Sequence, residues 1–199
     1  MEDRVRRHFQ ESIATKQTAI VVAPAVSAAA AMMTQCLLED GKILSCGNGG
    51  SAADSQHFSS ELLNRFELER PGLPAVALTT DSSTLTSIGN DYAFADIFAK
   101  QVRALGQPAD VLLAISTSGN SENVVRGLAA ARERGLLTVG TAGYAGGAMA
   151  EAAARGQIDH MVVVPSASVH RIQEAQTTMY HVLWELVQHA LAVPDSPGP

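Results

Sequence analysis

Two segments rich in glycine and hydroxyl side chains have the composition of anion-binding loops. One is Ser45–Ser51, with the sequence SCGNGGS, and the other is Ser116–Ser121, with the sequence STSGNS. Glycine lets the backbone turn tightly and approach a ligand closely, and the start of a helix presents unpaired N–H groups and the positive end of its dipole. Hydroxyls and backbone amides of this kind can bind a phosphate without lysine. Either loop alone could be a turn with a capping serine, but the two together favour a phosphate site.

These loops do not match the common nucleotide-binding motifs. The sequence lacks GxxxxGK[ST], and neither loop has the GxGxxG spacing of a dinucleotide site. Nucleotides are therefore not the expected ligands.

A second set of reactive side chains lies on two predicted helices. His57 and Glu61 are four residues apart, which places them on one helix face. Gln173 and His181 are two turns and roughly 80° apart at 3.6 residues per turn, so both can lean toward one site. Such a pair alone is more often a surface contact, and a histidine in an apolar stretch is more often a core residue. Two imidazoles, a carboxylate and an amide are nevertheless suitable ligands for zinc or a similar divalent ion.

The elements around these residues predict an α/β protein. Short apolar runs at 42–46, 75–79, 110–116, 136–141 and 160–165 alternate with helical patterns at 52–66, 90–105, 121–134 and 168–191. This alternation predicts a doubly wound five-stranded parallel sheet with right-handed crossovers. Both loops then follow strands at their carboxyl ends, where open α/β sheets bind ligands.

Composition and charge narrow the class of protein. We expect helices in residues 1–40 that pack on the domain or on another subunit, one domain at 41–192, and a flexible tail at 193–199.

A net charge of −6 argues against nucleic acid as a partner. We find no signal peptide and no apolar run of the roughly 20 residues that span a bilayer, so we expect a cytoplasmic protein that does not contact membranes. Cys36 and Cys46 are expected to be reduced.

The motifs CGNGGS, HFSSEL, GND, ISTSGNS and RIQE occur in this order and resemble the phosphoheptose isomerase group of sugar isomerase (SIS) domains over essentially the whole chain. The resemblance implies a flavodoxin-like sheet, a homotetramer with shared sites, and conversion of sedoheptulose 7-phosphate to D-glycero-D-manno-heptose 7-phosphate for the lipopolysaccharide core. The substrate residues that it implies are Asn48, Gly49, Gly50, Ser51, Glu61, Asn90, Asp91, Ser116, Thr117, Ser118, Ser121 and Gln173. The zinc ligands that it implies are His57, Glu61, Gln173 and His181.

Aldose–ketose isomerisation moves a proton between adjacent carbons through an enediol, and it needs a base, an acid and a group that stabilises the oxyanion. Glu61 and His181 suit the first two roles, in an order that the sequence does not define. A metal would polarise the carbonyl.

A non-catalytic relative offers an alternative function. Phe9–Ile13 and Asn64–Glu67 also resemble a sugar-phosphate-binding SIS adaptor of the replication initiator DnaA, which lacks the carboxylate and histidine found here as Glu61 and His181. Two positions depart from the isomerase pattern: His170 stands where some isomerases have an acidic residue, and Gln176 where a histidine is common. These departures concern substrate contacts rather than the reaction.

Overall fold

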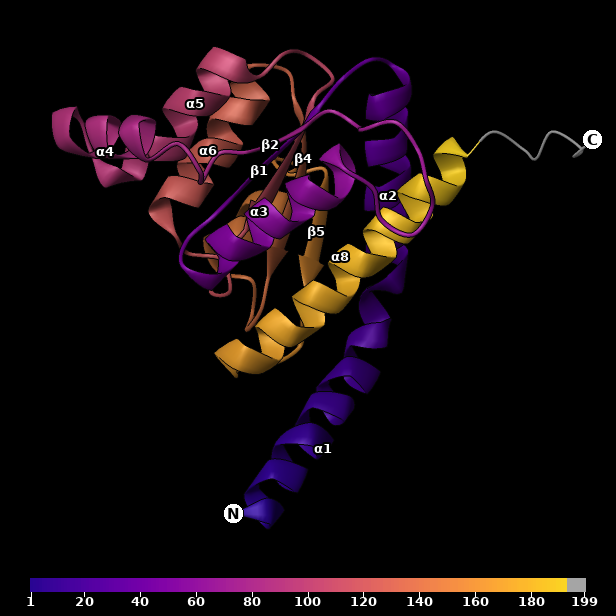
Figure 1. Cartoon of the computed structure of the whole chain (residues 1–199). Helices are drawn as coiled ribbons and strands as arrows, with labels where there is room; N and C mark the ends of the chain where they lie inside the picture. Colours follow the sequence, from indigo (N-terminus) through magenta and orange to yellow (C-terminus); the bar gives the residue numbers. More distant parts are fainter. Residues whose placement is uncertain (193–199) are drawn as a thin grey trace, which may run out of the picture.

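A five-stranded parallel sheet forms the centre of the protein. The computed structural model describes residues 1–192, so the tail expected at 193–199 lies outside the described residues (Figure 1). The strands are β1 (Ile43–Gly47), β2 (Ala75–Ala77), β3 (Val111–Ile115), β4 (Leu137–Ala142) and β5 (His160–Val163), in the order β2-β1-β3-β4-β5. All neighbouring pairs are parallel, which confirms the predicted fold class.

Helices cover both faces of the sheet. On one face lie α2 (Ala23–Leu38), α3 (Gly50–Leu63) and α8 (Val169–Leu191), and on the other lie α5 (Ile97–Leu105), α6 (Glu122–Glu133) and α7 (Gly147–Ala154). Strand β3 shows why: Val111, Leu113 and Ile115 face the first layer, while Leu112 and Ala114 face the second. Successive strand residues point to opposite faces, so a strand buried on both sides is apolar throughout.

One predicted helix is wrong in extent. The pattern at 90–105 suggested a single helix, but the structure has α4 (Ser82–Asp91), a 3-10 turn at Phe94–Asp96 and then α5. The side chain of Asp81 caps α4 by accepting a hydrogen bond from the N–H of Thr84 at 3.1 Å. An aspartate at this position is a common helix start, and it defines α4 independently of the later apolar pattern.

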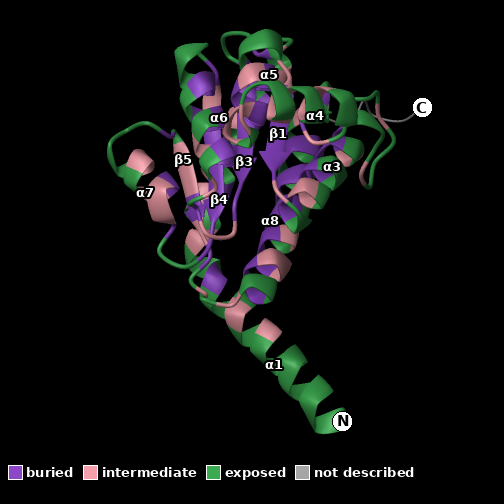
Figure 2. Cartoon of the chain, turned by 90° about the vertical axis from the view of Figure 1, so that its left-hand side faces the viewer, coloured by how far each residue is buried: buried purple, intermediate pink, exposed green. Residues whose placement is uncertain are grey.

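The N-terminal segment forms two helices, as expected for residues 1–40. Helix α1 (Glu2–Ala19) extends away from the body, and a 3-10 turn at Ile20–Val22 joins it to α2, which packs on the sheet (Figures 1 and 2). The run Glu2–Leu38 contains an 18-residue window of mean hydropathy 1.7 that is 33% buried and is long and apolar enough to cross a membrane. We expected no such stretch from the sequence. This test uses length and composition only, and the core helix of a soluble protein and an N-terminal signal sequence both pass it; in this run Ala29, Ala30 and Met33 lie in the core.

Candidate active site

The loop between β3 and α6 is shaped by its own hydroxyl groups. The Oγ atoms of Ser116 and Ser121 lie 3.0 Å apart, and the N–H of Gly119 donates to Ser116 Oγ at 3.2 Å. The N–H of Asn120 donates to Ser118 Oγ at 3.1 Å. Gly119 has a φ of +68°, a conformation that glycine adopts without strain. The hydroxyl groups of Ser116, Ser118 and Ser121 therefore all form hydrogen bonds within this loop.

The loop between β1 and α3 lies beside it, because β1 and β3 pair in register with Gly47 opposite Ile115. The carboxamides of Asn48 and Asn123 exchange two hydrogen bonds of 2.8 Å, which joins this loop to the first turn of α6. Helix α3 begins at Gly50, directly after Gly49 with its φ of +54°. The starts of α3 and α6 therefore meet at one edge of the sheet, and both present N–H groups there.

Gln173 brings α8 to the same edge. A Cβ atom added to Gly50 would lie 2.5 Å from Gln173 Nε2, so this amide lies directly against the start of α3. Gln173, a predicted substrate residue, therefore lies in close contact with the first loop.

The two histidines meet between α3 and α8. His57 Nε2 lies 3.3 Å from Glu61 Oε1, and the rings of His57 and His181 are centred 5.8 Å apart. His181 Nδ1 lies 2.7 Å from the carbonyl oxygen of Thr177. Because a carbonyl only accepts, Nδ1 must donate its hydrogen here, and Nε2 is left with a free lone pair. The side chains of His57 and Glu61 remain 44% and 26% exposed, so a solute can reach them.

Two further residues support this group and were missed in the sequence. Asp54 lies one turn before His57 on α3; burial raises the pKa of its carboxyl, and the nearby His57 lowers it. Arg70 closes the end of α3 by donating to the carbonyls of Glu61 at 2.7 Å and Leu62 at 2.8 Å. Burial lowers the pKa of the Arg70 guanidinium, and the charge of Glu61 raises it. The spacing of Asp54 from His57 could have revealed the first residue, but no local pattern marks the second.

Other predicted residues lie apart from the histidines. Asn90 and Asp91 are exposed at the end of α4, where the Asn90 amide donates to the Asp91 carboxylate at 2.8 Å. Leu85 and Phe94, on either side of them in the sequence, line a cavity of about 170 Å³ together with the loop 47–49. The structure therefore places the GND motif on a segment that borders the first loop.

The two departures from the family pattern differ in their surroundings. Gln176 is fully buried and donates to Thr141 Oγ1 at 3.1 Å, so it belongs to the core. His170 is exposed, and its ring is centred 6.0 Å from that of His8 on α1.

The predicted zinc ligands on α3 and α8 do not surround a common point as the ligands of a bound ion would. Within residues 1–192, no group of three or more His, Cys, Asp or Glu side chains is arranged to hold a metal ion. His57 and Glu61 face each other instead.

Comparison with known proteins shows the family of the chain. The family model for the SIS domain matches residues 8–143. The phosphoheptose isomerase of Alkalilimnicola ehrlichii is 57% identical over 95% of this chain and 96% of that protein. The chain belongs to the phosphoheptose isomerase family. The corresponding enzyme of Chromohalobacter salexigens is 56% identical over 96% of both chains. The structure of phosphoheptose isomerase GmhA from Neisseria gonorrhoeae superposes on this member of the family with a TM-score of 0.87 and 46% identity, over 94% of this chain and 98% of that one.

Proposed function

We propose that this phosphoheptose isomerase converts sedoheptulose 7-phosphate into D-glycero-D-manno-heptose 7-phosphate, the form of heptose that supplies the lipopolysaccharide core. The relatives that are 52–57% identical over nearly the whole chain are all named phosphoheptose isomerases, so an aldose–ketose isomerase is the activity they support. The observation that supports the assignment most strongly is the grouping of Glu61, His57 and His181 across α3 and α8, since α3 itself begins at a loop suited to phosphate.

The reaction requires one proton to leave C1 of the ketose and one to arrive at C2, while the hydroxyl proton moves from O1 to the oxygen at C2. Glu61 is suited to proton transfer at one of these carbons, because its carboxylate lies beside His57 and stays accessible. In the metal-free site His181 is suited to the other, because its Nδ1 donates to the Thr177 carbonyl and the Nε2 lone pair is open, whereas zinc bound at Nε2 would occupy that lone pair. The Arg70 hydrogen bonds fix the backbone at Glu61, which favours a constant position for its carboxylate.

The phosphate is expected at the edge where α3 and α6 begin. The donors there are the hydroxyls of Ser116, Thr117, Ser118 and Ser121 and the N–H groups of Gly49 and Gly50, whereas the N–H of Ser51 donates to the Asn48 carbonyl at 2.9 Å. Their orientation is supported by the Asn48–Asn123 pair, which links the two loops. A binding site of neutral donors holds a phosphate through hydrogen bonds and helix dipoles, and it releases the product more readily than a lysine-rich site would.

We also propose that His57, Glu61, Gln173 and His181 bind zinc. Their chemistry fits the ion: the Nδ1–H of His181 is held by a backbone carbonyl, the usual support for a ligating Nε2, and a carboxylate lies next to the second imidazole. When bound, zinc would polarise the substrate carbonyl and stabilise negative charge on its oxygen. Exhaustive chelation, with metal content and activity measured on the same sample, tests this. Full activity in metal-free protein would refute the zinc proposal and leave Glu61 and His181 as an unassisted pair.

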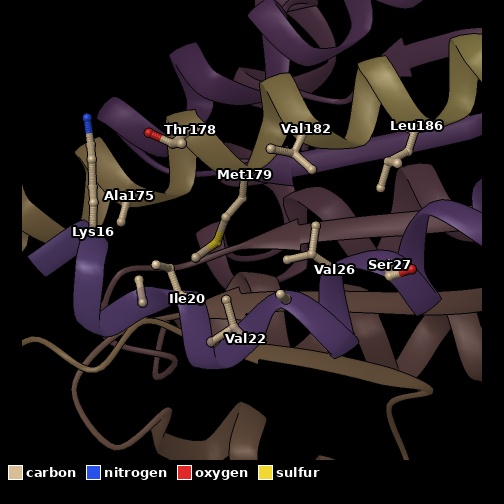
Figure 3. Close-up of a pocket in the computed structure, with 12 residues that line it drawn as sticks. Lys16, Ile20, Val22, Val26, Ser27, Ala175, Thr178, Met179, Val182 and Leu186 are labelled. Carbon is tan, nitrogen blue, oxygen red and sulfur yellow. The ribbon is translucent and has the colours of Figure 1, made fainter.

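A homotetramer is the proposed assembly. Val5, Phe9 and Ile13 follow one another at intervals of four residues on α1, and their side chains are exposed. A cavity of about 420 Å³ lies between the α1–α2 segment and α8, where Met179 and Val182 face Ile20 (Figure 3). An apolar stripe and cavity of this kind favour burial against another subunit. Light scattering on Phe9→Glu should show a smaller particle than the wild type, and an unchanged tetramer would remove α1 from the interface.

Turnover separates this function from the DnaA-binding adaptor, which the isomerase relatives do not support. The protein is incubated with sedoheptulose 7-phosphate and followed by phosphorus NMR, with Glu61→Gln as the matched control. A new heptose phosphate signal from the wild type alone supports the proposed reaction, which we place in the cytoplasm. Absence of a new signal, although the sugar phosphate binds, would favour the adaptor.

A further inference from the structure

The single tryptophan of the sequence lies beneath both site histidines. Trp184 is 1% exposed, and its ring is centred 4.9 Å from that of His57 and 4.9 Å from that of His181. Both imidazoles therefore pack against one buried indole, and both histidines are exposed to solvent, although the ring of Phe66 also lies 5.9 Å from that of His181.

Trp184 joins the two helices that hold the reactive side chains. It follows His181 by three residues on α8, whereas His57 comes from α3. Phe58 and Phe66 enclose the indole from other directions, with ring centres 5.7 and 5.5 Å away. The indole is thus held in place, and it limits the directions in which either imidazole can turn.

The contact is made by the ring rather than by its N–H group. Trp184 Nε1 is buried and has no hydrogen-bond partner among the described residues. A buried indole usually finds a partner for this donor, so the position favours the size and flatness of the ring over its hydrogen bonding.

We infer that Trp184 is a positioning residue that sets the orientation of His57 and His181 relative to each other. The inference rests on the proposed function, in which these imidazoles work with Glu61. A half-exposed imidazole that is not packed against the indole would sample other rotamers. A displacement of about 1 Å at reacting groups can lower the rate about a hundredfold. The rings packed on the indole come from His57, Phe58, Phe66 and His181 and not from the phosphate loops, so substrate binding should depend little on it.

Steady-state kinetics with sedoheptulose 7-phosphate test this inference. Trp184→Leu should lower kcat by about ten- to a hundredfold and change KM by less than about threefold. Trp184→Phe keeps an aromatic wall and removes only the unpartnered N–H, so it should recover most of kcat. Val102→Ala is the control for a core substitution, because Val102 is fully buried in the other hydrophobic core, on the opposite face of the sheet from Trp184. It should leave kcat near the wild-type value. Loss of kcat in Val102→Ala equal to that in Trp184→Leu, or no recovery with phenylalanine, would overturn the inference.

Tryptophan fluorescence tests the same contact without turnover. Because Trp184 is the single tryptophan, its emission reports on the two imidazoles directly. His57→Leu and His181→Leu should each change the emission intensity, whereas His189→Leu, further along α8, should not. Emission that is insensitive to both site histidines would overturn the proposed contact even if the enzyme is active. Absence of wild-type turnover, with this fluorescence pattern intact, would refute the proposed reaction and leave the packing of the imidazoles on Trp184 standing.

Discussion

Gly119→Ala is the substitution that should most clearly separate loop geometry from overall stability. A Cβ atom at Gly119 would lie 1.9 Å from the carbonyl oxygen of Gly146, and contacts under 3.0 Å are essentially never seen. The obstacle is backbone, so no side-chain rotation relieves it, and the two loops must separate by about 1 Å. Overpacking of this kind costs about 1–3 kcal/mol, and a left-handed alanine costs about 1–2 kcal/mol more. We expect a loss of roughly 2–5 kcal/mol in the free energy of unfolding.

The same shift should disturb the phosphate site. The N–H of Gly119 holds Ser116 Oγ, and its carbonyl accepts from the N–H of Met149 at 3.0 Å. Moving this residue weakens both contacts, so affinity for inorganic phosphate should fall at least about tenfold, equivalent to about 1.4 kcal/mol. Urea unfolding and calorimetric titration with phosphate measure the two effects on one sample.

Two other glycines provide matched controls. Gly156 has a φ of +69° and open space around it, so Gly156→Ala should show only the left-handed cost of about 1–2 kcal/mol and normal phosphate affinity. Gly89 lies within α4 with nothing near its Cβ position, so Gly89→Ala should stabilise the protein by about 0.5–1 kcal/mol. The reasoning is refuted if Gly119→Ala binds phosphate normally and unfolds at the same urea concentration as Gly156→Ala.

Three further predictions concern other parts of the account. Ser121→Ala should weaken sugar-phosphate binding by about 1.5–3 kcal/mol with little change in the thermal midpoint, and unchanged affinity by titration would place the phosphate elsewhere. Arg70→Met should lower kcat by a larger factor than it raises KM, because it frees the backbone at Glu61. A variant in which KM rises while kcat stays at the wild-type value would contradict this role. Burial raises the pKa of Cys36 to about 11 and of Cys46 to about 12, so both thiols should stay protonated and unreactive toward a thiol reagent at pH 8 until urea is added. Rapid labelling of the native protein would contradict the burial.

The sequence was informative where local patterns determine structure. The apolar runs predicted five parallel strands, and the serines of the loop at 116–121 were predicted to bind phosphate because a helix cap needs only one of these hydroxyls. Contacts between distant segments were not predictable in the same way. The pairing of Asn48 with Asn123 depends on β1 and β3 being neighbours in register, which no local pattern specifies.

Two other residues show the same limit. Trp184 sits in an apolar stretch of α8, and its periodicity indicates only that it faces the core. Its position under His57 follows from the packing of α8 against α3, which depends on many side chains at once. Arg70 lies in an irregular segment, where no repeat indicates which carbonyls its guanidinium will reach.

Proton transfer through an enediol by Glu61 and His181 is the central claim, and turnover in deuterated water tests it most directly. The proton that reaches C2 should come at least partly from solvent, because a carboxylate and an imidazole both exchange with water. We predict deuterium at C2 of the heptose phosphate formed by the wild type, and neither product nor exchange in Glu61→Gln, which still binds the sugar phosphate. Product that contains no solvent deuterium, or a Glu61→Gln variant that exchanges at the wild-type rate, would contradict the assignment.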